Sequence, residues 1–210
     1  MEPEESDYLP KQDQFESIKG PTYNLAIINI VIFILTTIWG KSLIEIGVVP
    51  LYTLGLSRVG LVYGEFWTPI TSMFVHSSLA HIGGNLIFLF VYGFKLEDMG
   101  YSKYGVYVSY LLTGLVAGLG SLPLLPFYSV SVGASGAIFG LLGTYVGVSR
   151  KNGEKDNTVI YAVIILFILA SGSPNTNIFA HLIGLVSGVI LGYSDFFAKF
   201  EDKIDPTQFN

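Results

Sequence analysis

The fold of this chain is decided by residues 104–149, which read YGVYVSYLLTGLVAGLGSLPLLPFYSVSVGASGAIFGLLGTYVGVS. These residues include no Asp, Glu, Lys or Arg, and the stretches 66–94 and 157–194 lack them as well. A helix needs roughly 20 predominantly apolar residues to cross a bilayer, so 104–149 is long enough for two crossings. The sequence therefore predicts a membrane protein with several spans.

Turn-forming residues divide the two longest charge-free stretches. Pro123 and Pro126 interrupt 104–149, and Ser-Gly-Ser-Pro-Asn at 171–175 interrupts 157–194. Helices usually end at such residues. The prediction is an all-α membrane protein with six transmembrane helices and a long interfacial first external loop. We expect the helices at about residues 24–40, 78–95, 103–122, 133–150, 157–172 and 178–197.

The two ends of the chain are polar. We expect residues 1–22 and 199–210 to be cytoplasmic tails on a six-helix domain of residues 23–198. The first twenty residues have no apolar h-region or cleavage site, so the first helix is expected to act as an uncleaved anchor. The chain has no cysteine, which excludes disulfides and thiolate chemistry. Its net charge of −5 argues against a nucleic-acid partner.

Basic residues are distributed unevenly between the two sides of a six-helix arrangement. Lys41 and Arg58 fall on one side, and the other side has Lys11, Lys19, Lys95, Lys103, Arg150, Lys151, Lys155, Lys199 and Lys203. By the positive-inside rule we expect a multi-pass cell-membrane protein with both termini in the cytoplasm. Residues 41–77 then form the first external loop, where Trp67 and Tyr63 suit the headgroup level.

Polar groups that a membrane rarely tolerates gather at one depth of the predicted helices. His81 precedes Lys95 by 14 residues, Ser135 precedes Arg150 by 15, and His181 precedes Asp195 by 14. At 1.5 Å per residue, each candidate lies ~21–23 Å above the cytoplasmic boundary. The second, fourth and sixth helices run in one direction in this topology. Their polar groups can therefore meet in one layer that is open to the extracytoplasmic side.

Ser135 is the candidate nucleophile. It lies in Gly133-Ala134-Ser135-Gly136, where glycines let a substrate approach and a helix N-terminus offers free N–H groups to an oxyanion. A serine hydroxyl needs a base within hydrogen-bond reach, and His181 is the candidate base. No Asp or Glu lies at this depth of the helices, which favours a Ser-His dyad over a triad.

Glycine spacing predicts close contact between the fourth and sixth helices. Gly136 and Gly140 are four residues apart, and so are successive members of Gly184, Gly188 and Gly192. Such small-residue faces permit close backbone approach. Glycines of this kind often serve only to pack helices. The same faces also carry Ser135 and His181, which favours a functional reading.

His81 and Asn85 form a second candidate pair. They lie four residues apart, hence on one helix face, and both can donate hydrogen bonds to an oxyanion. An intramembrane His or Asn can also be only a helix-to-helix hydrogen-bond partner. A zinc site of His76, His81 and His181 is an alternative, although helical spacing would separate His76 from His81 by about 140°. We expect no metal and no cofactor.

These residues together resemble the signatures of one family. The motifs are His76-x4-His81-x3-Asn85, Gly133-Ala134-Ser135-Gly136 and Ala180-His181-x2-Gly184-x3-Gly188. They are similar to the three signatures of rhomboid proteases, because they occur in the same order and on the second, fourth and sixth helices. The resemblance extends from about Glu65 to Tyr193. The resemblance implies a rhomboid-like six-helix bundle.

The resemblance also implies roles for individual residues. Ser135 is similar to the family's nucleophile, His181 to its general base, and His81 and Asn85 to its oxyanion donors. The supporting residues are Gly133, Gly136, Phe139, His76 and Gly184. Phe139 resembles the aromatic residue that stacks on the catalytic histidine. Glu97 resembles a structural acid. The chain departs from the family's common Trp-Arg pair in the first loop, since it has Trp67-Thr68.

The implied activity is that of an intramembrane serine endopeptidase that hydrolyses peptide bonds in or near transmembrane segments. The expected partners are transmembrane protein substrates and the lipid bilayer, and the sequence gives no oligomeric state. One alternative is a catalytically inactive rhomboid-like binder of transmembrane helices, although such proteins typically lack the serine or histidine. Another is a small transporter, but the chain has no inverted repeat or paired carboxylates.

Overall fold

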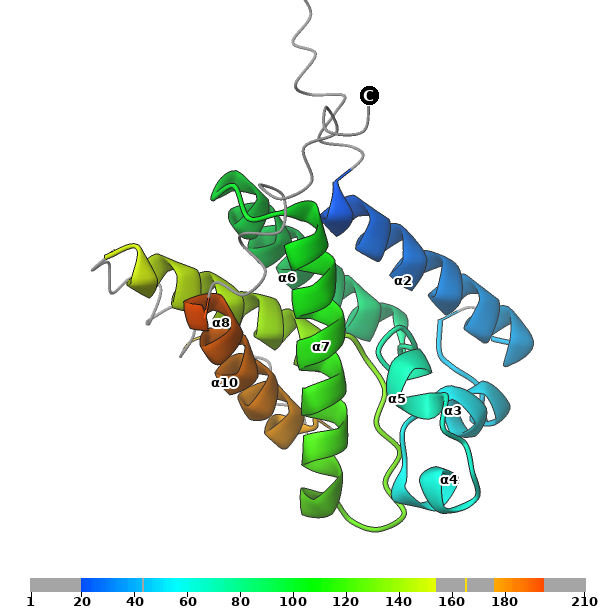
Figure 1. The fold of residues 1–210 in the computed structure, drawn as a ribbon. Coiled ribbons are helices and arrows are strands. Elements are labelled where there is room, and N and C mark those ends of the chain that lie inside the picture. The colour runs from blue at the N-terminus through cyan, green and yellow to red at the C-terminus, as the bar shows by residue number, and fades with distance from the viewer. Residues whose placement is uncertain (1–19, 43, 154–164, 166–175, 195–210) are drawn as a thin grey trace, which may run out of the picture.

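The protein is described by a computed structural model that covers residues 20–42, 44–153, 165 and 176–194 (Figure 1). Within these residues all regular secondary structure is helical, and extended backbone pairs only at two isolated bridges, Glu45 with Ser78 and Leu56 with Ser131. The all-α prediction is therefore confirmed for this part. The predicted fifth helix, apart from residue 165, and most of both predicted tails lie outside the described residues.

Five long helices correspond to predicted spans. They are α2 (Pro21–Trp39), α6 (Leu79–Asp98), α7 (Lys103–Ser121), α8 (Ser135–Lys151) and α10 (Ile178–Ser194). Three of them, α2, α6 and α7, are long and apolar enough to cross a membrane, and α10 is apolar but shorter. The length of α7 here includes its 3-10 extension η2 (Leu122–Leu124). The observed bounds differ from the predicted ones by at most three residues.

Local chemistry explains where these helices begin. Ser78 and Ser102 precede α6 and α7, and each hydroxyl accepts a hydrogen bond from the N–H three residues further on. α2 begins with Pro21, whose missing N–H has no consequence in a first helical turn. α8 begins two residues later than predicted because Gly133 has a φ of 121°, which no α-helix accommodates.

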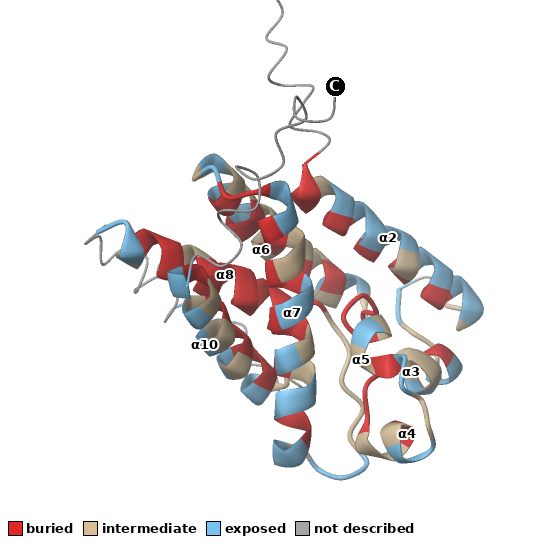
Figure 2. Ribbon diagram, in the orientation of Figure 1, coloured by how far each residue is buried: buried red, intermediate tan, exposed pale blue. Residues whose placement is uncertain are grey.

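α8 is the innermost helix of the described bundle. Most of its residues are buried, as Figure 2 shows, and it contacts α6, α7 and α10. α2 instead exposes large apolar side chains along one face, including Ile27, Ile34 and Leu35. An exposed apolar face of this extent suits contact with lipid. The arrangement is that of a helical membrane protein with one central helix.

α8 and α10 pack backbone against backbone. A methyl group added at Gly184, Gly188 or Gly192 would lie 2.1–2.2 Å from the carbonyl oxygen of Gly136, Gly140 or Thr144, respectively. The partner numbers rise together, so the two helices run in the same direction. The predicted close and parallel contact between the fourth and sixth helices is therefore confirmed.

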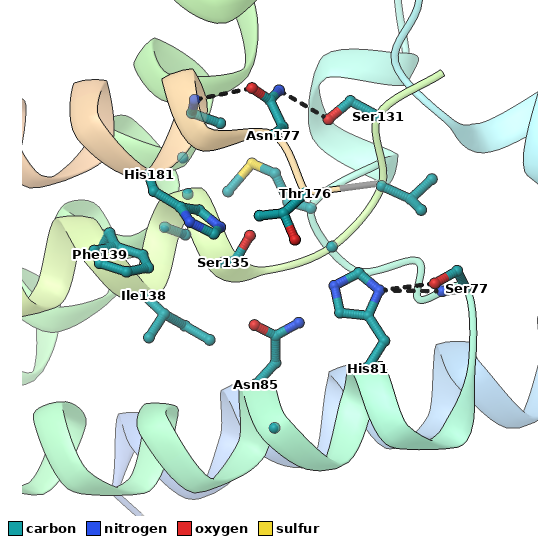
Figure 3. A pocket seen from close by; sticks show the side chains of 18 of the residues that line it. Ser77, His81, Asn85, Ser131, Ser135, Ile138, Phe139, Thr176, Asn177 and His181 are labelled. Atoms are coloured by element: carbon teal, nitrogen blue, oxygen red, sulfur yellow. Dashed lines mark hydrogen bonds between the residues drawn. The ribbon is translucent and has the colours of Figure 1, made fainter. Parts of the chain in front are cut away.

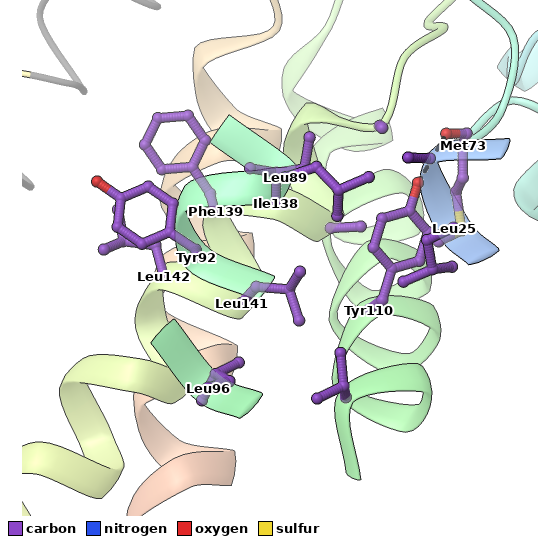
Figure 4. Packing of buried hydrophobic residues seen from close by; sticks show 14 of the residues in the cluster. Leu25, Met73, Leu89, Tyr92, Leu96, Tyr110, Ile138, Phe139, Leu141 and Leu142 are labelled. Carbon is purple, nitrogen blue, oxygen red and sulfur yellow. Dashed lines mark hydrogen bonds between the residues drawn. The ribbon is translucent and has the colours of Figure 1, made fainter. Parts of the chain in front are cut away.

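A buried apolar cluster joins α2, α6 and α7 to α8 (Figure 4). It includes Leu25 of α2, Leu89 of α6, Tyr110 of α7 and Leu141 of α8, each of which is at most 2% exposed. The Tyr110 hydroxyl also donates a hydrogen bond to the Met73 carbonyl oxygen at 3.4 Å. The cluster continues into Ile138 and Phe139, so the first turns of α8 belong to the core.

Glu97, near the C-terminal end of α6, holds the start of α2. Its carboxylate accepts hydrogen bonds from the Thr22 N–H at 3.0 Å and from the Thr22 hydroxyl at 2.6 Å. A carboxylate at a helix N-terminus is also stabilised by the helix dipole. Glu97 thus connects two helices, which is the structural role that the resemblance implied for it.

The loop of residues 41–77, which we expect to be external, is folded, and the sequence had not indicated this. Residues 41–77 contain three short helices, α3 (Val48–Leu54), α4 (Arg58–Val62) and α5 (Thr68–Thr71). Thr68, in place of the family's common arginine, is buried, and its hydroxyl donates to the Glu65 carbonyl oxygen at 2.8 Å. The neighbouring Trp67 Nε1–H donates to the Thr53 carbonyl oxygen at 2.8 Å.

Arg58 joins this loop to the segment that precedes α8. Its Nη2 donates to the Leu125 carbonyl oxygen, and its guanidinium lies 5.0 Å from the centroid of the Phe127 ring. Leu56 and Ser131 exchange two backbone hydrogen bonds, at 2.9 and 2.8 Å. The backbone that leads to Ser135 is therefore held by the loop of residues 41–77.

Candidate active site

A pocket of about 1030 Å³ opens between the N-terminal ends of α6, α8 and α10 and the segment before α8 (Figure 3). Its lining includes Ser135, His181, His81 and Asn85. These side chains come from three different helices and point into the same space in Figure 3. The structure thus brings together the four residues that sequence analysis selected as catalytic candidates.

Ser135 is the first residue of α8 and follows a firmly held backbone. The Gly133 N–H donates to the Ser72 carbonyl oxygen at 2.8 Å, and the Ala134 N–H donates to His76 Nε2 at 3.5 Å. The first N–H groups of a helix, here including that of Ser135, have no intrahelical partner. The hydroxyl therefore sits where the dipole of α8 is positive.

His181 lies on α10 and is 3% exposed. Its ring stacks on Phe139 of α8, with centroids 4.4 Å apart and an interplanar angle of 19°. This is the contact that the resemblance implied for Phe139. The Nδ1 atom of His181 has no hydrogen-bond partner among the residues that the structure describes. Among the described residues, the contact that orients this imidazole is its stacking on Phe139.

Ser135 and His181 flank the point where α8 and α10 meet. A methyl group on Gly136 would lie 3.7 Å from Ala180, and one on Gly184 would lie 2.2 Å from the Gly136 carbonyl oxygen. Both side chains extend from this contact into the pocket. Figure 3 draws both residues and shows no hydrogen bond between them. Ser135 and His181 are therefore held at one helix contact, and no hydrogen bond joins their side chains.

His81 and Asn85 converge on the space beside Gly133. A methyl group on Gly133 would lie 2.7 Å from His81 Nε2 and 3.7 Å from Asn85 Nδ2. Asn85 is buried, and within the described part of the chain its Nδ2 has no hydrogen-bond partner. Buried donors are nearly always paired, and an orphaned one is costly. An anionic oxygen in this space would satisfy it.

His76 supports the backbone around the pocket. It is fully buried, its Nδ1 lies 3.2 Å from the Phe74 carbonyl oxygen, and its Nε2 accepts from the Ala134 N–H. Burial, aided by the nearby His81 ring, lowers the pKa of His76 to about 3. The neutral ring can therefore donate from Nδ1 and accept at Nε2, which joins the loop at Phe74 to the segment before α8 at Ala134.

Comparison with known proteins adds an independent observation. The family model described as the Rhomboid domain matches residues 63–197, which contain all three motifs of the pocket. This chain belongs to the rhomboid family.

Rhomboid relatives occur in bacteria and plants. YdcA of Bacillus subtilis (strain 168) is 31% identical over 141 residues, which are 65% of this chain and 70% of YdcA. The rhomboid protease GluP of the same bacterium is 31% identical over 173 residues, 80% of this chain and 33% of GluP. Rhomboid-like protein 11, chloroplastic, of Arabidopsis thaliana is 38% identical over 127 residues, 60% of this chain and 43% of that protein. The chain thus spans less than half the length of the last two.

The described residues of this rhomboid chain contain no three-histidine metal site. The rings of His76 and His81 lie 5.1 Å apart, centroid to centroid, so the predicted angular separation of about 140° was wrong. His76 precedes α6, and helical periodicity does not apply to it. His181 instead stacks on Phe139, and no group of three His, Cys, Asp or Glu that could hold a metal ion occurs in the described ranges.

Several polar residues of the rhomboid pocket were not expected from the sequence, and Asn177 is one of them. Its Oδ1 accepts from the Ala180 N–H at 3.0 Å, at the start of α10. Its Nδ2 donates to the hydroxyls of Ser121 at 2.9 Å and Ser131 at 3.2 Å. The signal was present, because Asn directly before an apolar run is a common helix N-cap. Asn177 therefore fixes the helix start that carries His181.

Proposed function

We propose that this protein is an intramembrane serine endopeptidase that hydrolyses peptide bonds in or near transmembrane segments of membrane proteins. The observation that carries the proposal is one pocket lined by Ser135, His181, His81 and Asn85. A hydroxyl, a base and two hydrogen-bond donors are the groups that peptide hydrolysis requires. Membership of the rhomboid family, which includes proteins named as proteases, supports the same activity.

The reaction proceeds through an acyl-enzyme. His181 accepts the Ser135 hydroxyl proton as the oxygen attacks the substrate carbonyl carbon and the carbonyl oxygen becomes an oxyanion. The C–N bond then breaks, and His181 gives its proton to the leaving amine. Water, deprotonated by His181, attacks the ester, and the serine leaves with that proton. His81 and Asn85, with the Ser135 N–H, donate to both oxyanions.

Two features of the pocket favour a dyad. His181 Nδ1 is buried and lacks a partner in the described chain, where a triad would place a carboxylate. Ser135 and His181 extend from one helix contact into the same pocket, as a dyad requires. Catalytic hydrogen bonds often tighten only in the substrate complex.

The proposed membrane arrangement follows the distribution of charge. Six helices within residues 23–198 cross the membrane, both termini are cytoplasmic, and the pocket opens to the extracytoplasmic side. The substrates are transmembrane proteins that are cut near their outer ends. A substrate helix must unwind locally first, because an intact helix keeps its carbonyl groups bonded. Small or polar residues near the scissile bond are therefore expected.

Cleavage of a transmembrane substrate by the purified full chain in lipid vesicles tests the proposal. Ser135→Ala and His181→Ala are each expected to lower the cleavage rate by about 10³-fold or more, because they remove nucleophile and base. Ser187→Ala is the matched control, since Ser187 lies on α10 and its hydroxyl bonds the Gly184 carbonyl oxygen of its own helix.

A fluorophosphonate probe separates an enzyme from an inactive binder. The probe is expected to label the wild-type protein and the Ser187→Ala control, and to leave Ser135→Ala unlabelled. Undiminished cleavage by either dyad variant contradicts the assignment. Substrate binding without cleavage or labelling by the wild type would identify a binder of transmembrane helices.

A further inference from the structure

Ser77 contacts the ring of His81 through two of its groups. Its backbone N–H donates to His81 Nδ1 at 3.4 Å, and its hydroxyl oxygen lies 3.0 Å from the same nitrogen, as the dashed lines in Figure 3 show. Ser77 also lines the pocket. Sequence analysis gave no role to this residue, because a serine one position before a helix N-cap carries no recognisable signal.

These contacts define the protonation state of His81. A backbone N–H can only donate, so its 3.4 Å contact with Nδ1 favours a free lone pair on that nitrogen. An imidazolium ring has no such nitrogen, and a neutral ring with a free Nδ1 carries its proton on Nε2. The Ser77 hydroxyl then also donates to Nδ1. Both contacts therefore favour one tautomer of the neutral ring.

The proton selected in this way lies on the atom that faces the reacting groups. His81 Nε2 borders the space beside Gly133, and Asn85 Nδ2 borders the same space without a partner of its own among the described residues. With the other tautomer, Nε2 would present a lone pair there and repel an oxyanion. The tautomer of His81 thus decides whether this position stabilises or destabilises negative charge.

The backbone of Ser77 is itself held in place. The Ile46 N–H donates to the Ser77 carbonyl oxygen at 3.0 Å, and the Leu79 N–H donates to the Ile44 carbonyl oxygen at 2.8 Å. Residues 44–46 of the external loop therefore run beside residues 77–79. This pairing aims the Ser77 N–H at the ring before any substrate is present.

We propose that Ser77 is a positioning residue for the oxyanion site: it holds His81 in the neutral, Nε2-protonated tautomer, from which Nε2–H donates to the substrate oxyanion. The inference rests on the proposed peptidase function. Ser77 acts through His81 and does not touch the substrate. The external loop thereby contributes to the electrostatics of the site through residues 44–46.

The chain offers a matched pair of serines for the test. Ser78, the next residue, accepts from the His81 backbone N–H at 3.2 Å and so caps α6 without contacting the ring. Ser77→Ala removes the hydroxyl bond to Nδ1, Ser77→Thr keeps it, and Ser78→Ala weakens only the helix cap. The three variants separate an effect on the ring from an effect on the helix start.

The first measurement is the tautomer of His81 by nitrogen-15 NMR of full-length protein with labelled histidine. The chain has three histidines, so His76→Gln and His181→Gln variants assign the signals. The Ser135→Ala background makes the result independent of turnover. In this background, alone or combined with Ser77→Thr or Ser78→Ala, we expect His81 to have an unprotonated Nδ1 and a protonated Nε2. When Ser77→Ala is added instead, we expect a second population of His81 that is protonated on Nδ1. A protonated Nδ1 with Ser77 in place overturns the inference.

The second measurement is substrate cleavage by the same serine variants with Ser135 intact. Ser77→Ala is expected to lower kcat about fivefold, the loss of one hydrogen bond, with KM nearly unchanged, and Ser77→Thr to restore it. Full kcat in Ser77→Ala, or an equal loss in Ser78→Ala, overturns the inference. No cleavage by wild-type protein that has the expected tautomer overturns the proposed function instead.

Discussion

The space beside Gly133 is where single residues matter most in this protein. Gly133 has a φ of 121°, in the left-handed region that side chains rarely adopt, and its missing Cβ leaves room next to His81 and Asn85. The position therefore has two requirements, a backbone conformation and an empty volume. Other glycines of the chain have only the first, which makes the two separable by experiment.

Gly133→Ala is expected to lower cleavage about 100-fold, the typical loss when one oxyanion donor is removed, because the methyl group fills the space beside His81 Nε2. Gly100→Ala is the matched control. Gly100 has a φ of 74°, and no atom of the described chain lies within 4 Å of an added Cβ. Both variants also carry a backbone cost on the order of 1–3 kcal/mol, because both positions have a positive φ. Thermal unfolding and cleavage rates check the prediction, and wild-type cleavage by Gly133→Ala contradicts it.

Among the helices, the pair α8 and α10 determines the geometry of the site. A methyl group added to any of three glycines of α10 would overlap a carbonyl oxygen of α8. The two helices therefore pack too closely to accommodate a larger side chain at these positions. Ser135 and His181 project from the first of these contacts. Any separation of the helices therefore also separates nucleophile from base. Stability and activity are expected to fall together when this contact is widened.

Gly188→Ala is expected to destabilise the protein by about 1–3 kcal/mol, the usual cost of overpacking, because its methyl group would lie 2.1 Å from the Gly140 carbonyl oxygen. Cleavage is expected to fall as well, although Gly188 does not line the pocket. Gly83→Ala on α6 is the control. Nothing described lies within 4 Å of its added Cβ, and alanine favours helix by up to about 1 kcal/mol. Equal unfolding temperatures for the two variants contradict the prediction.

For the molecule as a whole, the common direction of α6, α8 and α10 is decisive. α8 and α10 are parallel by their glycine register, and the pocket lies at the N-terminal ends of all three helices. The segment before α8 and the loop of residues 41–77 cover this end. The proposed topology places it on the extracytoplasmic side, which makes the pocket reachable by water from outside.

Cysteine labelling tests this topology cleanly, because the chain has no cysteine of its own. Tyr128→Cys lies in the exposed segment before α8, and Asn152→Cys lies in the exposed turn that ends α8. A membrane-impermeant maleimide added to intact cells is expected to label only Tyr128→Cys. Asn152→Cys is expected to react only after the membrane is opened. The reverse pattern contradicts the proposed orientation.

The helices and the candidate residues were largely predictable from sequence. A long stretch without charged residues predicts a membrane helix, because a charged side chain is costly at every position inside the membrane. The predicted bounds of five helices therefore differ from the observed bounds by at most three residues. Counting residues from charged boundaries also predicted a common layer for Ser135, His181 and His81, and the structure places all three around one pocket. These properties depend on composition and helical rise alone.

The contacts that shape the pocket could only come from the tertiary structure. The approach of His76 to His81, the bond from Ser77 to the His81 ring, and the contact of Arg58 with the segment before α8 all involve non-helical backbone. No period along the sequence describes such backbone, because its course is determined by what packs against it. The sequence by itself determined which side chains were candidates for the site, because their spacing depends on helical rise alone, and the packing of helices and loops decided which of their atoms face one another.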